Sequence, residues 1–534
     1  MPSPIATVRS NWRAFTPLEK RNIIIYIIGI MFYKFGLEAF TGSIIALATN
    51  RYEWDAAQQK TTPITFERVG LLTGLNQAFQ CVGSIIIAPL AKRYRTKNVL
   101  ATAIFIFGLS SAILMIVDAS TGGRLKPANT PKADFSYYGR YNTDGMIPIY
   151  CITGIAYGMV ELIRRIIPRD IVGGNVEKLR CMDALVHMFY EVAGTAGSFC
   201  TALALIPQFG NNFSFIITPI LFTCGSLVWF TISEVDKRPS KPDAPEKQSG
   251  YFLALASAFF LFGESVWTGA KIIFSSRKYV WLLPGYTFAL YGHRYLESSA
   301  APIIARRYLG NSAWYQIMVA GSNFGELLGA LFVFLFTGWI KTPIPWLRLD
   351  ALLLMILWYL PYWYPPSGDV KYAWIVFATF IPVSFGWAAG DVSLAAYIQA
   401  SIARLESKTA NVSALGAVMA FLYSTYVVIY AITAPLLGRY VDQVSKQNGG
   451  DVHNAVQSIL GVQYTLIAVC MLAASFVPKG AMAFNPKMLY GETLATEVGI
   501  HTSLDTVDDG SDKPQQQPTH RDFEDDGKGS GDKA

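Results

Sequence analysis

The sequence predicts an all-α polytopic membrane protein with twelve transmembrane helices arranged as two pseudo-repeated six-helix halves. Hydrophobic residues make up 52% of its 534 residues and charged residues only 15%, which is too apolar for an ordinary soluble enzyme. The apolar residues are gathered in runs of roughly 20, the length that a helix needs to cross about 30 Å of hydrocarbon. Polar residues also recur in the same order in both halves of the chain.

The N-terminal half begins after a basic segment. Residues 1–21 include Arg9, Arg13, Lys20 and Arg21 and no small-residue cleavage site, so we expect a cytoplasmic segment followed by a retained span. The N-terminal six-helix bundle, residues 22–233, then has its spans at Asn22 to Ala48, Arg68 to Leu90, Asn98 to Val117, Met146 to Ile163, Met182 to Ile206 and Phe213 to Ser233.

Residues 234–278 are predicted to form a central cytoplasmic linker with an interfacial helix. The stretch from Glu234 to Ser249 is polar, whereas Tyr251 to Phe274 is apolar enough to span but contains Gly263, Glu264 and Lys271. If that segment crossed the membrane, the second half would be inverted. The distribution of Lys and Arg among the short loops favours twelve spans over thirteen, although only modestly.

The C-terminal six-helix bundle, residues 279–478, has predicted spans at Tyr279 to Ile304, Ser312 to Ile340, Leu347 to Tyr364, Tyr372 to Ile402, Ala410 to Leu437 and Val456 to Val477. Residues 479–534 should be a cytoplasmic tail, largely disordered because its Asp, Gly, Gln, Lys and Pro cannot bury a core. Basic loops follow the second and fourth spans, which places both termini in the cytoplasm.

The two halves align at polar positions inside the spans. Lys34 and Glu38 in the first span fall opposite His293 and Glu297 in the seventh. Further matches pair Gln77, Gln80 and Gly83 with Asn323, Glu326 and Gly329, and Gly154 and Gly158 with Gly386 and Gly390. Each match is weak alone, but their order is what a duplicated six-span unit would give.

A basic loop after the second span carries a family resemblance. The stretch Ala88-Pro89-Leu90-Ala91-Lys92-Arg93-Tyr94-Arg95-Thr96-Lys97 is similar to the loop signature of the major facilitator superfamily, usually Gly-x3-Asp-x2-Gly-Arg-Arg. Lys92 stands at the Asp position and Arg95 at the second Gly, which puts the usual gating salt bridge in doubt. The resemblance implies that Lys92, Arg93 and Arg95 form a gating loop. Ala434 to Tyr440 echoes this motif at the predicted end of the eleventh span, where it has no evident role.

The resemblance also implies a mode of action. Members of this superfamily are secondary transporters that work by alternating access, with the first, fourth, seventh and tenth spans lining a central cavity. Gly194 and Gly197 resemble a fragment of the antiporter signature of proton-coupled drug exporters, without its Pro, and sugar-porter signatures are absent. The chain as a whole resembles fungal members. Export of a drug or secondary metabolite is therefore the leading hypothesis for the direction of transport.

Ionisable residues inside spans are the best functional signal, because each costs about 3 kcal/mol or more to insert. Lys34 and Glu38 share one face of the first span, and His293, Arg294 and Glu297 do the same in the seventh. A carboxylate held by a cation can exchange that partner for a substrate or a proton. The alternative is an intrahelical ion pair that only fixes packing.

Three more spans carry candidate groups for substrate or proton coupling. Asp183, His187 and Glu191 recur every four residues and could relay protons up one face of the fifth span, or could simply pair across to another helix. Glu326 with Asn323 in the eighth span, and Asp391 in the tenth, lack a partner in their own helix. Arg294 and Lys34 are the candidate partners.

Other classes of function are poorly supported. The net charge of +7 sits in loops between spans, which disfavours nucleic-acid binding. The absence of GxxxxGK[ST], HExxH and GxSxG predicts a protein that is not an enzyme and needs no cofactor or metal. We expect a monomer in the lipid bilayer, most readily the plasma membrane and alternatively a vacuolar or other internal membrane, with a small-molecule substrate and protons as partners. Alternatives to export are a proton-coupled uptake symporter and a transporter-like receptor that moves no solute.

Overall fold

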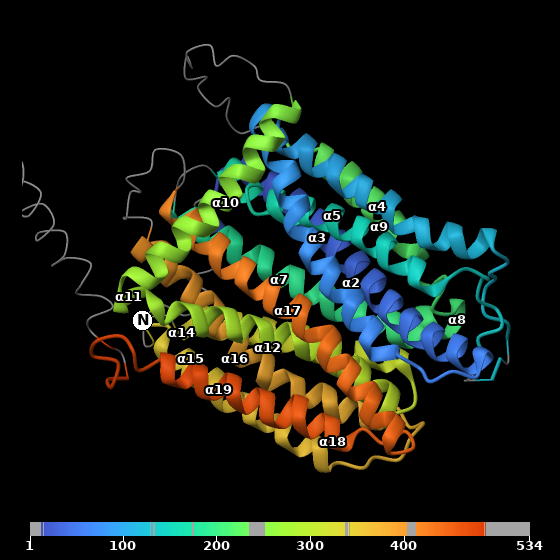
Figure 1. The fold of residues 1–534 in the computed structure, drawn as a ribbon. Coiled ribbons are helices and arrows are strands. Elements are labelled where there is room, and N and C mark those ends of the chain that lie inside the picture. The colour runs from blue at the N-terminus through green and yellow to red at the C-terminus, as the bar shows by residue number, and fades with distance from the viewer. Residues whose placement is uncertain are drawn as a thin grey trace, which may run out of the picture. The chain divides into compact units, whose positions relative to one another are not determined.

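The computed structural model describes residues 12–13, 15–128, 130–131, 134–172, 176–233, 251–336, 340, 342–402, 413–484 and 486, and these residues form helices and loops without a strand (Figure 1). Residues 1–11, the polar part of the linker (234–250) and residues 487–534 lie outside the described part. The expectation of a disordered tail therefore lies outside it as well.

The N-terminal half is built from five long helices and several short ones. Thr16 caps the first long helix with a capping box to Glu19, and Pro17 occupies its first turn, which fixes where the helix starts. The helices are α2 (Pro17–Gln59), α3 (Thr65–Arg93), α4 (Thr96–Ser120), α5 (Met146–Arg164), α6 (Ile167–Val172), α7 (Val176–Cys200), α8 (Ile206–Phe209) and α9 (Ile217–Phe230). A π-helical turn, Thr201–Leu205, joins α7 to α8.

The C-terminal half follows the same plan, but π-helical segments interrupt its first span. Its helices are α11 (Arg277–Val280), α12 (Ala289–Tyr295), α13 (Ala301–Ile303), α14 (Tyr315–Phe336), α15 (Ile344–Leu353), α16 (Lys371–Ile402), α17 (Ala414–Gln447), α18 (His453–Val456) and α19 (Gln463–Ala474). The π-helical segments Leu283–Phe288 and Leu296–Ala300 separate α11, α12 and α13, and a third, Ile304–Tyr308, follows α13. Pro284 and Pro302, which remove backbone donors, lie in this region.

Eleven helices among the described residues are long and apolar enough to cross a membrane, and one of them is α10 (Tyr251–Ser275) in the linker. The other ten match predicted spans. The sixth predicted span is a shorter apolar helix, Ser214–Phe230, and the seventh is the broken helix of residues 277–308. Together these account for the twelve predicted spans. The eleventh predicted span extends further than predicted, because α17 continues to Gln447.

Helix α10 crosses one end of the bundle instead of running along it (Figure 1). Near its start, the Tyr251 hydroxyl donates to the Ile86 carbonyl near the end of α3. Near its end, Gly269 packs against the backbone of Ala417 at the start of α17. We call this end of the bundle, predicted to be cytoplasmic, the linker end, and the opposite one the far end. These contacts agree with an interfacial helix, which stays a prediction.

Matching helices pack in matching ways in the two halves. Gly83 of α3 packs against the carbonyl of Ile155 in α5, and Gly329 of α14 packs against the carbonyl of Phe385 in α16. A side chain at either glycine would lie within 2.5 Å of that carbonyl oxygen. The match of Gly83 with Gly329 therefore marks equivalent close contacts between helices. The match of Gly154 and Gly158 with Gly386 and Gly390 does not, because the first two glycines pack against α3 and the last two against α15.

The two halves are joined tightly at the far end. Arg306 Nε donates to Glu53 Oε2 at 2.6 Å, and the Ser312 hydroxyl donates to Asn50 Oδ1 at 2.8 Å. The Ala434 to Tyr440 motif lies here, inside α17 and not at its end as predicted. Its Gly438 lets α17 approach the backbone of Phe66 at the start of α3. The motif that had no evident role thus helps to close the far end.

Candidate functional site

The first charged pair lies in the middle of α2. Lys34 Nζ is 2.6 Å from Glu38 Oε1, and both side chains are 10% exposed or less. Helix α7 approaches this pair closely because Gly194 faces Lys34 and Gly197 faces the Phe35 carbonyl. A Cβ at Gly194 would lie 2.4 Å from Lys34 Cε. The two antiporter-like glycines therefore have a packing role beside the ion pair.

A second cluster joins α12, its π-helical continuation and α14. His293 Nε2 lies 2.6 Å from Glu326 Oε1 and 3.4 Å from Glu297 Oε1. Glu297 Oε2 is bound by Arg294 Nη1 at 2.9 Å, and Glu297 Oε1 also accepts a hydrogen bond from the Ser322 hydroxyl at 2.6 Å. Glu297 lies in the π-helical turn Leu296–Ala300, a feature that often marks functional sites. We call His293, Glu297 and Glu326 the histidine cluster.

Polar side chains connect the two charged regions across the two halves. Lys34 donates to Asn323 Oδ1 at 3.4 Å, and Asn323 donates to the Ser198 hydroxyl, also at 3.4 Å. Ser198 in turn donates to Glu38 Oε2 at 3.1 Å. Because Asn323 follows Ser322, which binds Glu297, α14 carries a continuous polar link between the pair in α2 and the histidine cluster.

The polar stripe on α7 leads from the linker end to this centre. Asp183 is exposed, the His187 side chain is 36% exposed, and the Glu191 side chain is only 2% exposed. His187 Nδ1 lies 4.0 Å from Glu191 Oε1. Glu191 interacts electrostatically with Glu326 and Lys34, and its Oε2 has no hydrogen-bond partner among the residues that the structure describes. Exposure thus declines step by step toward the centre, as expected for a path open to water at the linker end.

Comparison with known protein families identifies the family of this chain. A family model described as the Major Facilitator Superfamily matches residues 21–421. The chain belongs to the major facilitator superfamily. It is a membrane transporter and not an enzyme, as the sequence predicted. A sequence search of curated proteins finds no match.

Solved transporters of this superfamily share its fold. A crystal structure of the nucleoside transporter NupG has a TM-score of 0.56 and 14% identity, covering 86% of this chain and 99% of that one. A D-xylose-proton symporter has a TM-score of 0.57 and 13% identity, covering 87% and 97%. A bacterial homologue of the human drug peptide transporters has a TM-score of 0.56 and 12% identity, covering 90% and 99%. At such identities the likeness shows the fold alone.

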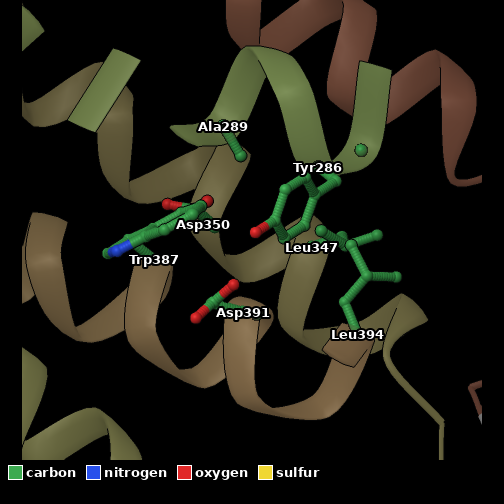
Figure 2. A pocket seen from close by; sticks show the side chains of 9 residues that line it. Tyr286, Ala289, Leu347, Asp350, Trp387, Asp391 and Leu394 are labelled. Carbon is green, nitrogen blue, oxygen red and sulfur yellow. The ribbon is translucent and has the colours of Figure 1, made fainter. Parts of the chain in front are cut away.

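The predicted gating-loop residues of this major facilitator protein lie apart from the histidine cluster, whereas Asp391 interacts electrostatically with His293 and Glu326. Lys92 and Arg93 end α3, and Arg95 is the N-cap residue of α4; Arg93 and Arg95 are exposed at the linker end. Asp391 lines a small cavity between α16 and α15 (Figure 2). Glu326, for which Arg294 and Lys34 were the candidate partners, contacts His293, because α14 passes beside α12, and it also interacts electrostatically with Arg294.

The histidine cluster is also the group of described residues that could hold a metal ion, since its ligand atoms lie within 4.8 Å of one another. Zinc would need each ligand atom at about 2.0–2.2 Å from the metal. Here Nε2 of His293 is already at hydrogen-bonding distance from Glu326, and Arg294 binds Glu297. The donors bind one another and a neighbouring cation, an arrangement that suits a shared proton better than a metal.

Several residues of the centre were not predicted as site residues. Ser198 and Ser322 connect the charged groups, and Asp350 lines the cavity with Asp391. Serines inside spans give no distinctive signal, because they usually bond their own helix backbone. Asp350 could have been predicted as a site residue, because it is an acidic residue in the first turn of the predicted span Leu347 to Tyr364.

Proposed function

We propose that this transporter is coupled to protons and that the histidine cluster carries the coupling proton. The observation that supports this most is the position of His293 Nε2, which faces Glu297 at 3.4 Å and Glu326 at 2.6 Å while its side chain is 2% exposed. Two carboxylates that face one buried nitrogen repel each other unless a positive charge lies between them. A proton on the imidazole supplies that charge.

Loss of this proton should change how the helices pack. Without it, Glu326 on α14 is left, among the described residues, with its interaction with Arg294, which already binds Glu297. Glu326 then gains by moving away from Glu297, and α14 is also the helix that binds Lys34 across the two halves. Protonation and the contact between the halves are therefore linked, which is what coupled alternating access requires.

The solute is a small organic molecule, and we propose export as its direction. The superfamily members of similar structure are named for nucleosides, D-xylose and peptides, all of them small organic solutes. Support for export comes from Gly194 and Gly197, which match part of an antiporter signature and pack beside Lys34 and Glu38. Uptake by proton symport remains the alternative and requires the opposite sign of coupling.

Flux measurements test this proposal. Metabolites inside and outside cells that lack the protein identify the solute, which is then followed in proteoliposomes under an imposed pH gradient. We expect the gradient to drive net flux, and His293→Gln to reduce that flux by at least about tenfold, within the range typical of coupling between sites. Solute counterflow without a gradient should change by less than about threefold, because it needs binding but no net proton movement.

Glu264→Gln serves as the control, since Glu264 lies on α10 and outside the centre. Flux toward the alkaline compartment would indicate uptake, and flux toward the acidic compartment supports export. Equal gradient-driven flux in wild type and His293→Gln would contradict the assignment of the coupling site. If no solute shows flux, the hypothesis of a transporter-like receptor that moves no solute would be favoured.

A further inference from the structure

One buried carboxylate at the centre takes no part in the proposed coupling. Glu191 lies on α7, and its side chain is 2% exposed. The one basic side chain within 4.0 Å of it, among the residues that the structure describes, is His187, whose Nδ1 is 4.0 Å from Glu191 Oε1 and too far for a hydrogen bond. No described residue donates a hydrogen bond to Glu191 Oε2. A negative charge on Glu191 would therefore have no close cation and no donor at this atom.

The three other carboxylates around Glu191 each have a close basic partner. The pairs are Glu38 with Lys34 at 2.6 Å, Glu297 with Arg294 at 2.9 Å, and Glu326 with His293 at 2.6 Å. Glu191 interacts electrostatically with all three of these acids and with the cation Lys34. Because Lys34 already binds Glu38 and also donates to Asn323, it is not free to pair with Glu191.

The balance of charges at the centre leaves one carboxylate over. If His293 is protonated as proposed, the four acids face three cations, namely Lys34, Arg294 and His293. The unmatched negative charge falls on Glu191, the acid without a close partner. A buried carboxylate without a partner is unstable in its charged form and becomes stable when it takes up a proton.

The other titratable groups near Glu191 do not supply the missing charge. The Tyr190 ring, also on α7, lies 4.6 Å from both Lys34 Nζ and the Arg164 guanidinium. Arg164 pairs with Glu161 at 2.7 Å, so these two residues add no net charge. A proton on His187 would sit on a side chain that is 36% exposed and would still leave the buried carboxylate without a hydrogen bond.

We propose that Glu191 is a second proton-carrying group of this transporter, protonated in the state with the far end closed and deprotonated later in the cycle. This inference rests on the proposed function and adds one proton to each cycle. On release, the O–H bond of the carboxyl group breaks and a carboxylate remains on Glu191. The proton passes to the His187 ring and from there to water at the linker end, after a side-chain rotation that shortens their separation by about 1 Å.

The place of Glu191 between the two halves links its proton to their movement. Helix α7 belongs to the N-terminal half and α14 to the C-terminal half, and they pack closely where Gly194 faces Asn323. Glu191 precedes Gly194 by three residues and interacts electrostatically with Glu326 on α14. A charge on Glu191 therefore repels Glu326 across this contact, and a proton removes the repulsion.

Infrared spectroscopy of the purified full-length protein in lipid nanodiscs tests the proton on Glu191, with hydrogen and deuterium ions as the only probes. A protonated carboxyl group has a C=O stretch that is distinct from the bands of a carboxylate and that shifts when the proton is exchanged for a deuteron. We expect this band at pH 7 in the wild-type spectrum minus the Glu191→Gln spectrum, and we expect it to shift in deuterated buffer. A difference spectrum that shows only a lost carboxylate would overturn the inference.

Two further variants make this measurement decisive. Asp369→Asn is the control, because Asp369 pairs with Lys371 in an exposed loop and its difference spectrum should show only a lost carboxylate. Glu191→Asp keeps an acid at this position, so its protonated band should persist at a slightly different frequency. If Glu191→Gln does not fold, the comparison of wild type with Glu191→Asp identifies the band, and identical carboxyl bands in these two proteins would overturn the inference.

Flux of the solute identified by the metabolite comparison measures whether this proton is coupled. With the membrane potential held at zero, one pH unit should balance about a 100-fold solute gradient in wild type and about a tenfold gradient in Glu191→Gln, since each proton contributes about one factor of ten. Equal gradients in both proteins would overturn the role of Glu191.

The two measurements separate this inference from the proposed function. A missing carboxyl band together with about a tenfold gradient in wild type would overturn the inference and leave the proposed function intact. A carboxyl band on Glu191 without gradient-driven flux of any solute would contradict proton-coupled transport instead.

Discussion

Several buried charges at the centre of this transporter have partners, and some partners lie on the same helix while others do not. The Lys34–Glu38 and Arg294–Glu297 pairs follow from spacings of four and three residues, so the sequence predicted their contact. The contact between His293 and Glu326 joins residues 33 positions apart on different helices. No local rule gives that contact. Of the candidate partners chosen from the sequence, Arg294 interacts electrostatically with Glu326 while it pairs with Glu297.

The Lys34–Glu38 pair allows a prediction about stability. Lys34→Met leaves the Glu38 carboxylate buried without its cation, and we expect unfolding free energy to fall by about 3–5 kcal/mol, the usual cost of breaking a buried pair. The double variant Lys34→Met with Glu38→Leu should recover most of this loss, because no charge is then left unpaired. Thermal or denaturant unfolding of purified protein in detergent measures both.

A matched control for this pair is Lys371→Met. Lys371 pairs with Asp369 in an exposed loop, where solvent replaces the lost partner, so stability should not change measurably. An equal loss in the single and double variants of the buried pair would show that packing of the Lys34 side chain, and not its charge, stabilises this region.

At the scale of elements, the segment with the greatest effect on topology is α10. Its length and apolar composition fit a span, yet it crosses the linker end and packs on Ile86 and Ala417. Phe252, Phe260, Trp267 and Phe274 on its outward face are more than 60% exposed, which suits the boundary between lipid headgroups and hydrocarbon. Sequence composition could not separate the two arrangements, because both bury an apolar helix in lipid.

Cysteine labelling at the two ends of α10 distinguishes an interfacial helix from a transmembrane span. Ser257 and Ser275 are exposed positions near opposite ends of the helix. In a background without other cysteines, we expect Ser257→Cys and Ser275→Cys to react with a membrane-impermeant maleimide from the same side of sealed vesicles. The reason is that an interfacial helix keeps both ends at one surface. Reaction from opposite sides would establish a thirteenth span and invert the second half.

At the scale of the whole molecule, the contacts between the halves define a state that is closed at the far end. Glu53 on α2 binds Arg306 and Arg307, and the Asp442 carboxylate accepts a hydrogen bond from the Glu67 amide at the start of α3. On the opposite side, between the linker end and the centre, the His187 side chain is 36% exposed, and at the centre the Arg294 side chain is 41% exposed. This combination is typical of an alternating-access transporter that is open on one side only.

Glu53→Gln should shift the equilibrium between the state that is closed at the far end and a state that is open there. It weakens two charged contacts between the halves, and a change of 1–3 kcal/mol corresponds to roughly 5–150-fold in population. Ser312→Cys, buried in the closed far end, reports opening through its rate of maleimide labelling. We expect Glu53→Gln to raise that rate at least fivefold. Asp144→Asn is the control, because Asp144 pairs with Arg68 within one half; an equal effect of both variants would argue against a specific closing contact.

The sequence by itself determined the helical membrane fold, the two related halves and most of the charged residues at the centre. These follow from local quantities, namely the length of hydrocarbon a helix must cross and the cost of inserting a charge. Only the tertiary structure decided which charges meet, that Asp350 shares a cavity with Asp391, where α10 lies and which end is closed. Those features depend on distances between residues up to 375 positions apart, such as Glu67 and Asp442, and helix packing alone sets such distances.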